Sequence, residues 1–149
     1  MLSAMLSACG VMCSECPAYH GADRGAAHQR RVAKAWQRIY GLEEAPEHIS
    51  CGGCLGTERD LFHTSRRCRA RRCCLRNGFG SCGECPMERC GDLEHAQAVW
   101  DGVPALADRL SRADVLEYAA PYLGHRERLA AIREREPSPR RGVEPGQVR

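Results

Sequence analysis

The chain has 149 residues, eleven of them cysteine, with a net charge of +3 and an aromatic content of only 5%. This length predicts a single domain, and so few aromatic residues predict a thin hydrophobic core that needs a further source of stability. The small net charge argues against a dedicated nucleic-acid binder, and the absence of any run of about 18 apolar residues excludes a membrane-spanning helix.

Apolar periodicity predicts two helical segments in the first half of the chain. Apolar side chains recur at helical spacing over 24–40, and Gly41 follows as a stop signal. A second helical segment is expected over 58–76. It ends at Asn77-Gly78, because glycine can adopt the left-handed conformation that follows a helix.

The second half of the chain also reads as helical. Asp92 is expected to cap a helix that 102–104 breaks, and Ser111 opens a further helix as part of a capping box. Pro121 should kink or split that helix. The segment 137–149 has no apolar period and is expected to be a disordered tail.

Metal ligation is the chemistry that the cysteine spacing favours. Three C-x2-C pairs are present, and in each a tight turn points both sulfurs at one ion. A structural zinc site contributes about 10–16 kcal/mol of apparent binding free energy, against a folding stability of about 5–15 kcal/mol. The candidate metal ligands are ten of the eleven cysteines: Cys9, Cys13, Cys16, Cys51, Cys54, Cys68, Cys73, Cys82, Cys85 and Cys90.

Disulfides in an exported protein are the alternative use of these cysteines. Leu6-Ser7-Ala8-Cys9 imitates the cleavage site of a bacterial lipoprotein precursor, but no basic residue precedes it. We therefore expect a cytoplasmic protein, in which cysteines stay reduced and bind metal.

The ordered cysteine motifs resemble those of an uncharacterised bacterial and archaeal family, domain of unknown function 3795. The resemblance covers 8–93 and departs at Cys74, where the family usually has alanine, and at 86–90, where an aromatic-proline pair usually precedes the last cysteine. It implies a presumed metal-binding module without an assigned reaction, and makes Cys74 the least favoured ligand. The motifs that carry it are Cys9-Gly-Val-Met-Cys13-Ser-Glu-Cys16-Pro17-Ala-Tyr19, Cys51-Gly-Gly-Cys54-Leu-Gly56, Cys68-Arg-Ala-Arg-Arg-Cys73, Asn77-Gly78 and Cys82-Gly-Glu-Cys85 through Cys90.

The expected fold class is mainly α, with zinc-knuckle-like turns and little or no β. Residues 1–136 would form one small, cysteine-rich, metal-stabilised domain. Its family-like core is 8–93, and its C-terminal helices occupy 92–136.

Two four-cysteine sites are one way to distribute the thiolates. Cys51, Cys54, Cys82 and Cys85 would form a ribbon-like site, and Cys9, Cys13, Cys16 and Cys90 a second one. Histidines close to the cysteine groups could replace a thiolate, namely His20, His28, His48 and His63.

Zinc in structural sites is the expected cofactor, with an iron–sulfur cluster in redox transfer as the alternative. Cys16-Pro17 and Cys85-Pro86 are endings typical of bacterial ferredoxin runs. No nucleophile with a base, no paired carboxylates and no phosphate-binding loop is found, so an enzyme is the less expected reading.

An arginine-rich stretch surrounds Cys68, Cys73 and Cys74 without any acidic residue. It could offset the negative charge of a metal thiolate site, bind the phosphates of a nucleic acid, or form a solvated face. Nucleic acid is thus a possible but not a favoured partner, and no other partner is predicted. The arginines are Arg66, Arg67, Arg69, Arg71, Arg72 and Arg76.

Overall fold

The computed structural model describes residues 5–87 and 89–135, and the disordered tail expected over 137–149 lies outside this range. Within the described residues the protein is mainly helical and contains no sheet. Two isolated bridges, Leu6 with Met12 and Tyr19 with Cys51, are the extended pairings found there. The mainly α fold class is therefore confirmed.

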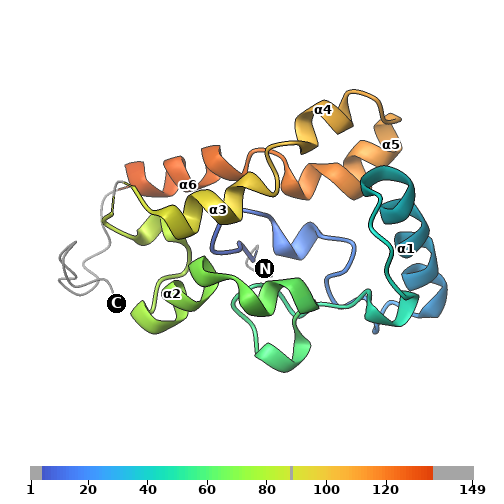
Figure 1. The fold of residues 1–149 in the computed structure, drawn as a ribbon, viewed down its shortest axis with the longest axis horizontal. Helices are drawn as coiled ribbons and strands as arrows, with labels where there is room; N and C mark the ends of the chain where they lie inside the picture. Colours follow the sequence, from blue (N-terminus) through green and yellow to red (C-terminus); the bar gives the residue numbers. More distant parts are fainter. Residues whose placement is uncertain (1–4, 88, 136–149) are drawn as a thin grey trace.

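Six α-helices and several shorter helical turns make up the described chain (Figure 1). A π-helical turn over Val115–Ala119 continues α5, and 3₁₀ turns occupy Cys13–Glu15, Pro46–His48, Glu58–Asp60, His63–Arg67, Cys82–Glu84 and Ala120–Tyr122. The α-helices are α1 (Ala26–Tyr40), α2 (Arg69–Asn77), α3 (Gly91–Ala98), α4 (Val103–Ala107), α5 (Arg112–Asp114) and α6 (His125–Glu134). None of these helices is long and apolar enough to cross a membrane.

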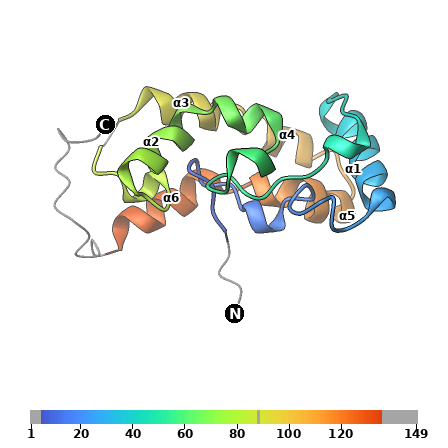
Figure 2. The ribbon, with the colours of Figure 1, turned by 90° about the horizontal axis from the view of Figure 1, so that it is seen from below.

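The N-terminal segment over 5–24 runs through the middle of the molecule. Figure 1 shows α2 on one side of it, α3 and α6 on the other, and α1 at one end, and Figure 2 shows the same arrangement from below. The core is divided into two small clusters, one around Ala8 and Leu129 and one around Val32 and Ile49. A core split in this way supplies less continuous apolar packing than a single one.

Close contacts fix the N-terminal segment against α6 and the 3₁₀ turn that precedes it. Gly10 has a φ of +100°, and a Cβ at this position would lie 2.1 Å from the carbonyl oxygen of His125. The Met12 N–H donates to the Pro121 carbonyl at 3.0 Å, and Arg128 donates to the Gly10 carbonyl at 2.9 Å. Only glycine combines this backbone conformation with so close an approach.

The first expected helix is confirmed, with its start two residues later than predicted. Gly25 precedes α1 with a φ of +96°, and Gly41 ends it in the left-handed conformation. Trp36 is buried on its inner face, where its ring meets Phe62 edge to face at 5.6 Å.

The prediction of one continuous helical segment over 58–76 is wrong. Leu61 and Cys68 adopt extended backbone conformations, which break the segment into two 3₁₀ turns and α2. Burial explains the first break, because Leu61 turns into the core and is only 4% exposed. Gly78, with a φ of +70°, follows α2 as predicted.

Asp92 does not cap α3, as had been expected. The cap position is Cys90, and Asp92 lies in the first helical turn, where its charge complements the helix dipole. The capping role of Ser111 is confirmed, since its Oγ accepts a hydrogen bond from the Asp114 N–H at 3.1 Å. Pro121 does split the helical run, which resumes as α6.

Candidate metal centre

Two C-x2-C pairs that are distant in sequence lie side by side in the fold. The bridge between Tyr19 and Cys51 joins their segments: the His20 N–H donates to the Cys51 carbonyl at 2.9 Å, and the Cys51 N–H donates to the Ala18 carbonyl at 2.8 Å. Tyr19 follows shortly after the pair Cys13 and Cys16, and Cys51 is the first cysteine of the pair Cys51 and Cys54. We call the four thiols that the bridge brings together the first thiol group: Cys13, Cys16, Cys51 and Cys54.

Backbone N–H groups face the sulfurs of the first thiol group. The N–H of Cys54 donates to the thiol of Cys13, and the N–H of Ala8 lies 3.5 Å from the Cys54 sulfur. The sulfur of Cys16 accepts hydrogen bonds from the backbone N–H groups of Ala18 and Tyr19. Such N–H donors stabilise thiolates, which is the arrangement expected of a zinc knuckle.

Burial works against ionisation of the same thiols. It raises the pKa of Cys13 and of Cys54 to about 12 and also raises the pKa of Cys16. Nearby thiols in the group add to this, because negative charges on them would repel one another. The thiols therefore stay protonated at neutral pH unless a cation takes the place of the protons.

Tyr122 and Arg71 support this group from two other parts of the chain. The Tyr122 hydroxyl lies 3.1 Å from the sulfur of Cys16. Arg71 is 5% exposed and donates to the carbonyls of Cys54 at 2.6 Å and Gly56 at 3.1 Å. The guanidinium thus fixes the Cys51–Cys54 turn through its backbone.

Two further cysteines flank the first thiol group next to Cys54. Charges on Cys9 and Cys68 would repel a charge on Cys54, so both lie near it. Cys9 is 8% exposed, and its sulfur lies 3.2 Å from the Ser7 hydroxyl. The region around Cys54 therefore holds more thiols than one tetrahedral ion needs.

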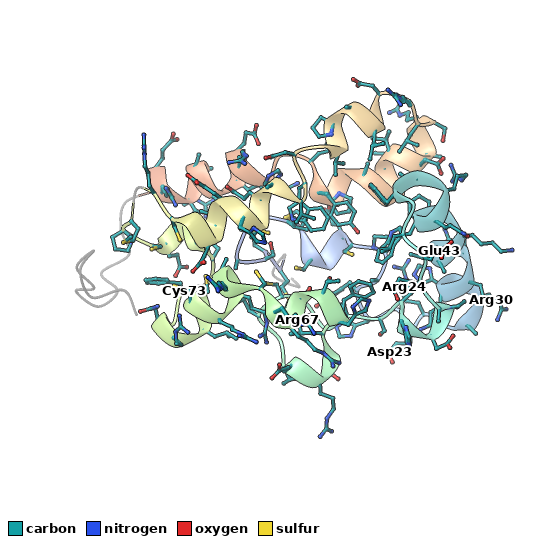
Figure 3. The ribbon with its side chains drawn as sticks, in the orientation of Figure 1. Asp23, Arg24, Arg30, Glu43, Arg67 and Cys73 are labelled. Carbon is teal, nitrogen blue, oxygen red and sulfur yellow. The ribbon has the colours of Figure 1, made fainter. Side chains whose placement is uncertain are left out.

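The remaining five cysteines form a second thiol group around a cavity of about 240 Å³. They come from α2, from the 3₁₀ turn Cys82–Glu84 and from the segment that leads into α3. Figure 3 labels one of them, Cys73, on α2 where the helix faces the start of α3. The second thiol group consists of Cys73, Cys74, Cys82, Cys85 and Cys90.

The closest contact described within the second group is between Cys74 and Cys82. Their sulfurs lie 3.6 Å apart, and both residues are buried. The hydrogen bond from Cys74 lowers the pKa of Cys82, and the same bond raises the pKa of Cys74. Burial raises the pKa of Cys73 and of Cys85.

The expected pairing of the cysteine groups is wrong. Cys51 and Cys54 lie with Cys13 and Cys16, because the bridge at Tyr19 sets that register. The expected partners Cys82 and Cys85 lie at the second cavity, together with Cys90. The five-residue spacing between Cys68 and Cys73 does separate them, because Cys68 lies near Cys54 whereas Cys73 lines the second cavity.

The sequence interpretation missed the role of three residues. Cys74 was the least favoured ligand, yet it lines the cavity with the other thiols of the second group. Its position four residues after Ala70, on the buried face of α2, is a helical spacing that could have found it. Arg71 and Tyr122 carry no sequence signal of their contacts, because their partners lie in other segments.

The four histidines considered as ligands have other partners. His28 Nε2 lies 2.7 Å from the Pro17 carbonyl oxygen, and His20 lies 3.7 Å from Asp23. His48 and His63 both approach Glu44. Each imidazole is thus accounted for by a carbonyl or carboxylate oxygen.

All eleven cysteines are free thiols in the structure, with no disulfide. In residues 5–87 and 89–135, no group of three or more histidine, cysteine, aspartate or glutamate side chains is arranged to hold a metal ion. The thiols gather into two groups without converging on a common point.

The arginine-rich stretch does not act as one surface. Arg71 is buried beneath the first thiol group, whereas Arg67, labelled in Figure 3, is exposed. Arg69 lies 3.9 Å from Asp92, and Arg72 donates to the carbonyl of Arg66 at 3.1 Å. The stretch is thus divided between an internal support and an outer face.

The family model described as "Protein of unknown function (DUF3795)" matches residues 5–95. The match contains both thiol groups and agrees with the resemblance seen over 8–93. No curated protein and no solved structure matches the chain.

Proposed function

The chain belongs to this family of proteins of unknown function, and we propose that it is a metal-binding module whose thiol groups hold zinc and thereby stabilise the fold. Cys13, Cys16, Cys51 and Cys54 would hold one ion. Cys73, Cys82, Cys85 and Cys90 would hold a second, with Cys74 beside them. Zinc would supply the positive charge that makes buried thiolates tolerable.

One observation carries the proposal: the two C-x2-C pairs lie together with N–H groups directed at their sulfurs. Desolvated thiols that also receive N–H bonds suit a bound cation better than ordinary apolar packing. A hydrophobic core split in two supports the same conclusion, since a structural zinc ion supplies about 10–16 kcal/mol of apparent binding free energy.

The residues present fit zinc in their chemistry. Each proposed set consists of four sulfurs, the ligand type and number of a structural zinc site. Free thiols also suit a reducing compartment, so we propose a cytoplasmic location. No catalytic step is assigned to either group.

The test is elemental analysis of the protein purified without oxygen, with paired variants. Two zinc ions per chain are expected, and both Cys13→Ser/Cys54→Ser and Cys82→Ser/Cys85→Ser should retain one. Chelation should remove the zinc and reduce the helical circular dichroism. Protein that is metal-free, fully helical and unable to take up Zn²⁺ would refute the proposal.

An iron–sulfur cluster in redox transfer is the second candidate. The endings Cys16-Pro17 and Cys85-Pro86 favour it, because a cysteine followed by proline ends the cluster-binding runs of bacterial ferredoxins. A brown preparation whose visible absorption bleaches on reduction would select iron. A colourless preparation with stoichiometric zinc would select the first candidate.

A further inference from the structure

The two thiol groups differ in what lies against their sulfurs. In the first group, Cys16 faces the hydroxyl of Tyr122, whose ring is buried and stacks on Trp100 at 4.7 Å. In the second group the thiols line a cavity instead; Cys73, Cys85 and Cys90 are partly buried, as are all four thiols of the first group.

The cavity is large enough to admit more than water. Its volume of about 240 Å³ is lined partly by apolar side chains, including Phe79 and Met87. A water molecule occupies about 30 Å³ in the liquid, so a small organic ligand has room beside the sulfurs.

Two arginines give the cavity a preference for anions. Arg76 and Arg133 both line it, and Arg133 donates to the Cys82 carbonyl at 3.4 Å. Asp92 is the one carboxylate among the described lining residues. Positive side chains at the entrance of a cavity attract negatively charged ligands.

The second group also has one thiol more than a zinc ion needs. Four thiolates complete a structural zinc site, whereas five cysteines line this cavity. Cys74 lies 3.6 Å from Cys82 and is only 1% exposed. Its sulfur is positioned to bind the metal when one of the other four thiols releases it.

We propose that the second thiol group is an exchangeable site, from which an anionic ligand that carries a thiol group enters the cavity and withdraws the metal, while the first group retains its ion. This inference rests on the proposed function. At each exchange, one metal–sulfur bond to the incoming ligand forms and one to a cysteine breaks. The proton lost by the incoming thiol passes to the released cysteine, so nothing is oxidised or reduced.

Release of zinc to a coloured chelator, 4-(2-pyridylazo)resorcinol, tests the proposal on the full chain loaded with two equivalents. Two phases of one equivalent each are expected, with the second group supplying the faster one. Cys82→Ser/Cys85→Ser should lose the fast phase and keep the slow one. Cys13→Ser/Cys54→Ser should lose the slow phase and keep the fast one.

A single phase, or a fast phase that belongs to the first group, would overturn this inference and leave the proposed function intact. A chain that takes up no zinc would contradict both. Cys74→Ala should slow the fast phase at unchanged zinc content, and an unchanged rate would overturn the role given to Cys74.

Alkylation of the unsubstituted, zinc-loaded chain gives a test that does not depend on variants that fold. Iodoacetamide followed by mass spectrometry should label Cys73, Cys85 and Cys90 before Cys13 and Cys16. The reverse order would overturn the proposal.

Discussion

The hydroxyl of Tyr122 lies 3.1 Å from the sulfur of Cys16, across 106 positions of sequence. The ring of the same tyrosine stacks on Trp100, so the hydroxyl is held in place by apolar packing. The C-terminal part of the chain, beyond the family match at residue 95, therefore contributes to the first thiol group.

Tyr122→Phe should remove this hydrogen bond and leave the ring stacking intact. The expected loss in the free energy of unfolding is about 0.5–1.5 kcal/mol for a neutral thiol and about 1.5–3 kcal/mol for a thiolate. Denaturant unfolding with and without zinc should thus show the larger loss in the zinc-loaded protein. Tyr19→Phe serves as the control, and equal losses in both variants would contradict the assignment.

Arg71→Lys should destabilise the protein by about 1–3 kcal/mol, because a lysine cannot reproduce the forked contacts with two carbonyls. Arg72→Lys is a matched control on the exposed side of the same helix, where a change within about 0.5 kcal/mol is expected. Urea unfolding measures both variants. Similar losses would show that the Cys54 turn does not depend on Arg71.

Gly10→Ala should lower the free energy of unfolding by at least about 1–3 kcal/mol, since the positive φ alone carries that strain and the added Cβ would meet the His125 carbonyl. In the control Gly91→Ala, the Cβ meets no atom within 4 Å, and no loss is expected. Thermal unfolding of the two variants compares them. A Gly10 variant as stable as the control would refute the close contact with α6.

Zinc affinity should rise with pH over the neutral range. Burial raises the pKa of Cys13 and Cys54 to about 12, so each thiol holds a proton there until the ion displaces it. Raising the pH weakens this competition and favours the metal-bound form. Competition titrations at several pH values with a chelator of known affinity measure the slope, and a pH-independent affinity would contradict ligation by these thiols.

Local features of the fold could be predicted from the sequence. Gly41 and Gly78 end their helices because glycine adopts the left-handed conformation without a steric penalty. Ser111 caps a helix through a hydrogen bond to a residue three positions later. In contrast, the break at Leu61 depends on a core that other segments build.

The site could be predicted in its residues but not in its grouping. C-x2-C spacing identifies pairs that act together, because that geometry is local. Which pairs meet is decided by long-range pairing, here the bridge at Tyr19 and Cys51. Cys74 likewise joins the second group through the packing of α2, on whose buried face it follows Ala70 by four residues.

The tie between Met12 and Pro121 has a consequence during synthesis. The N–H of Met12 finds its acceptor only after more than a hundred further residues have been added, which takes about 5–20 s at typical elongation rates. Throughout that interval the sulfur of Cys16 lacks the contact that the Tyr122 hydroxyl makes with it in the complete fold. The ribosome thus exposes the nascent thiols to whatever ions surround it before the C-terminal helices can close over them.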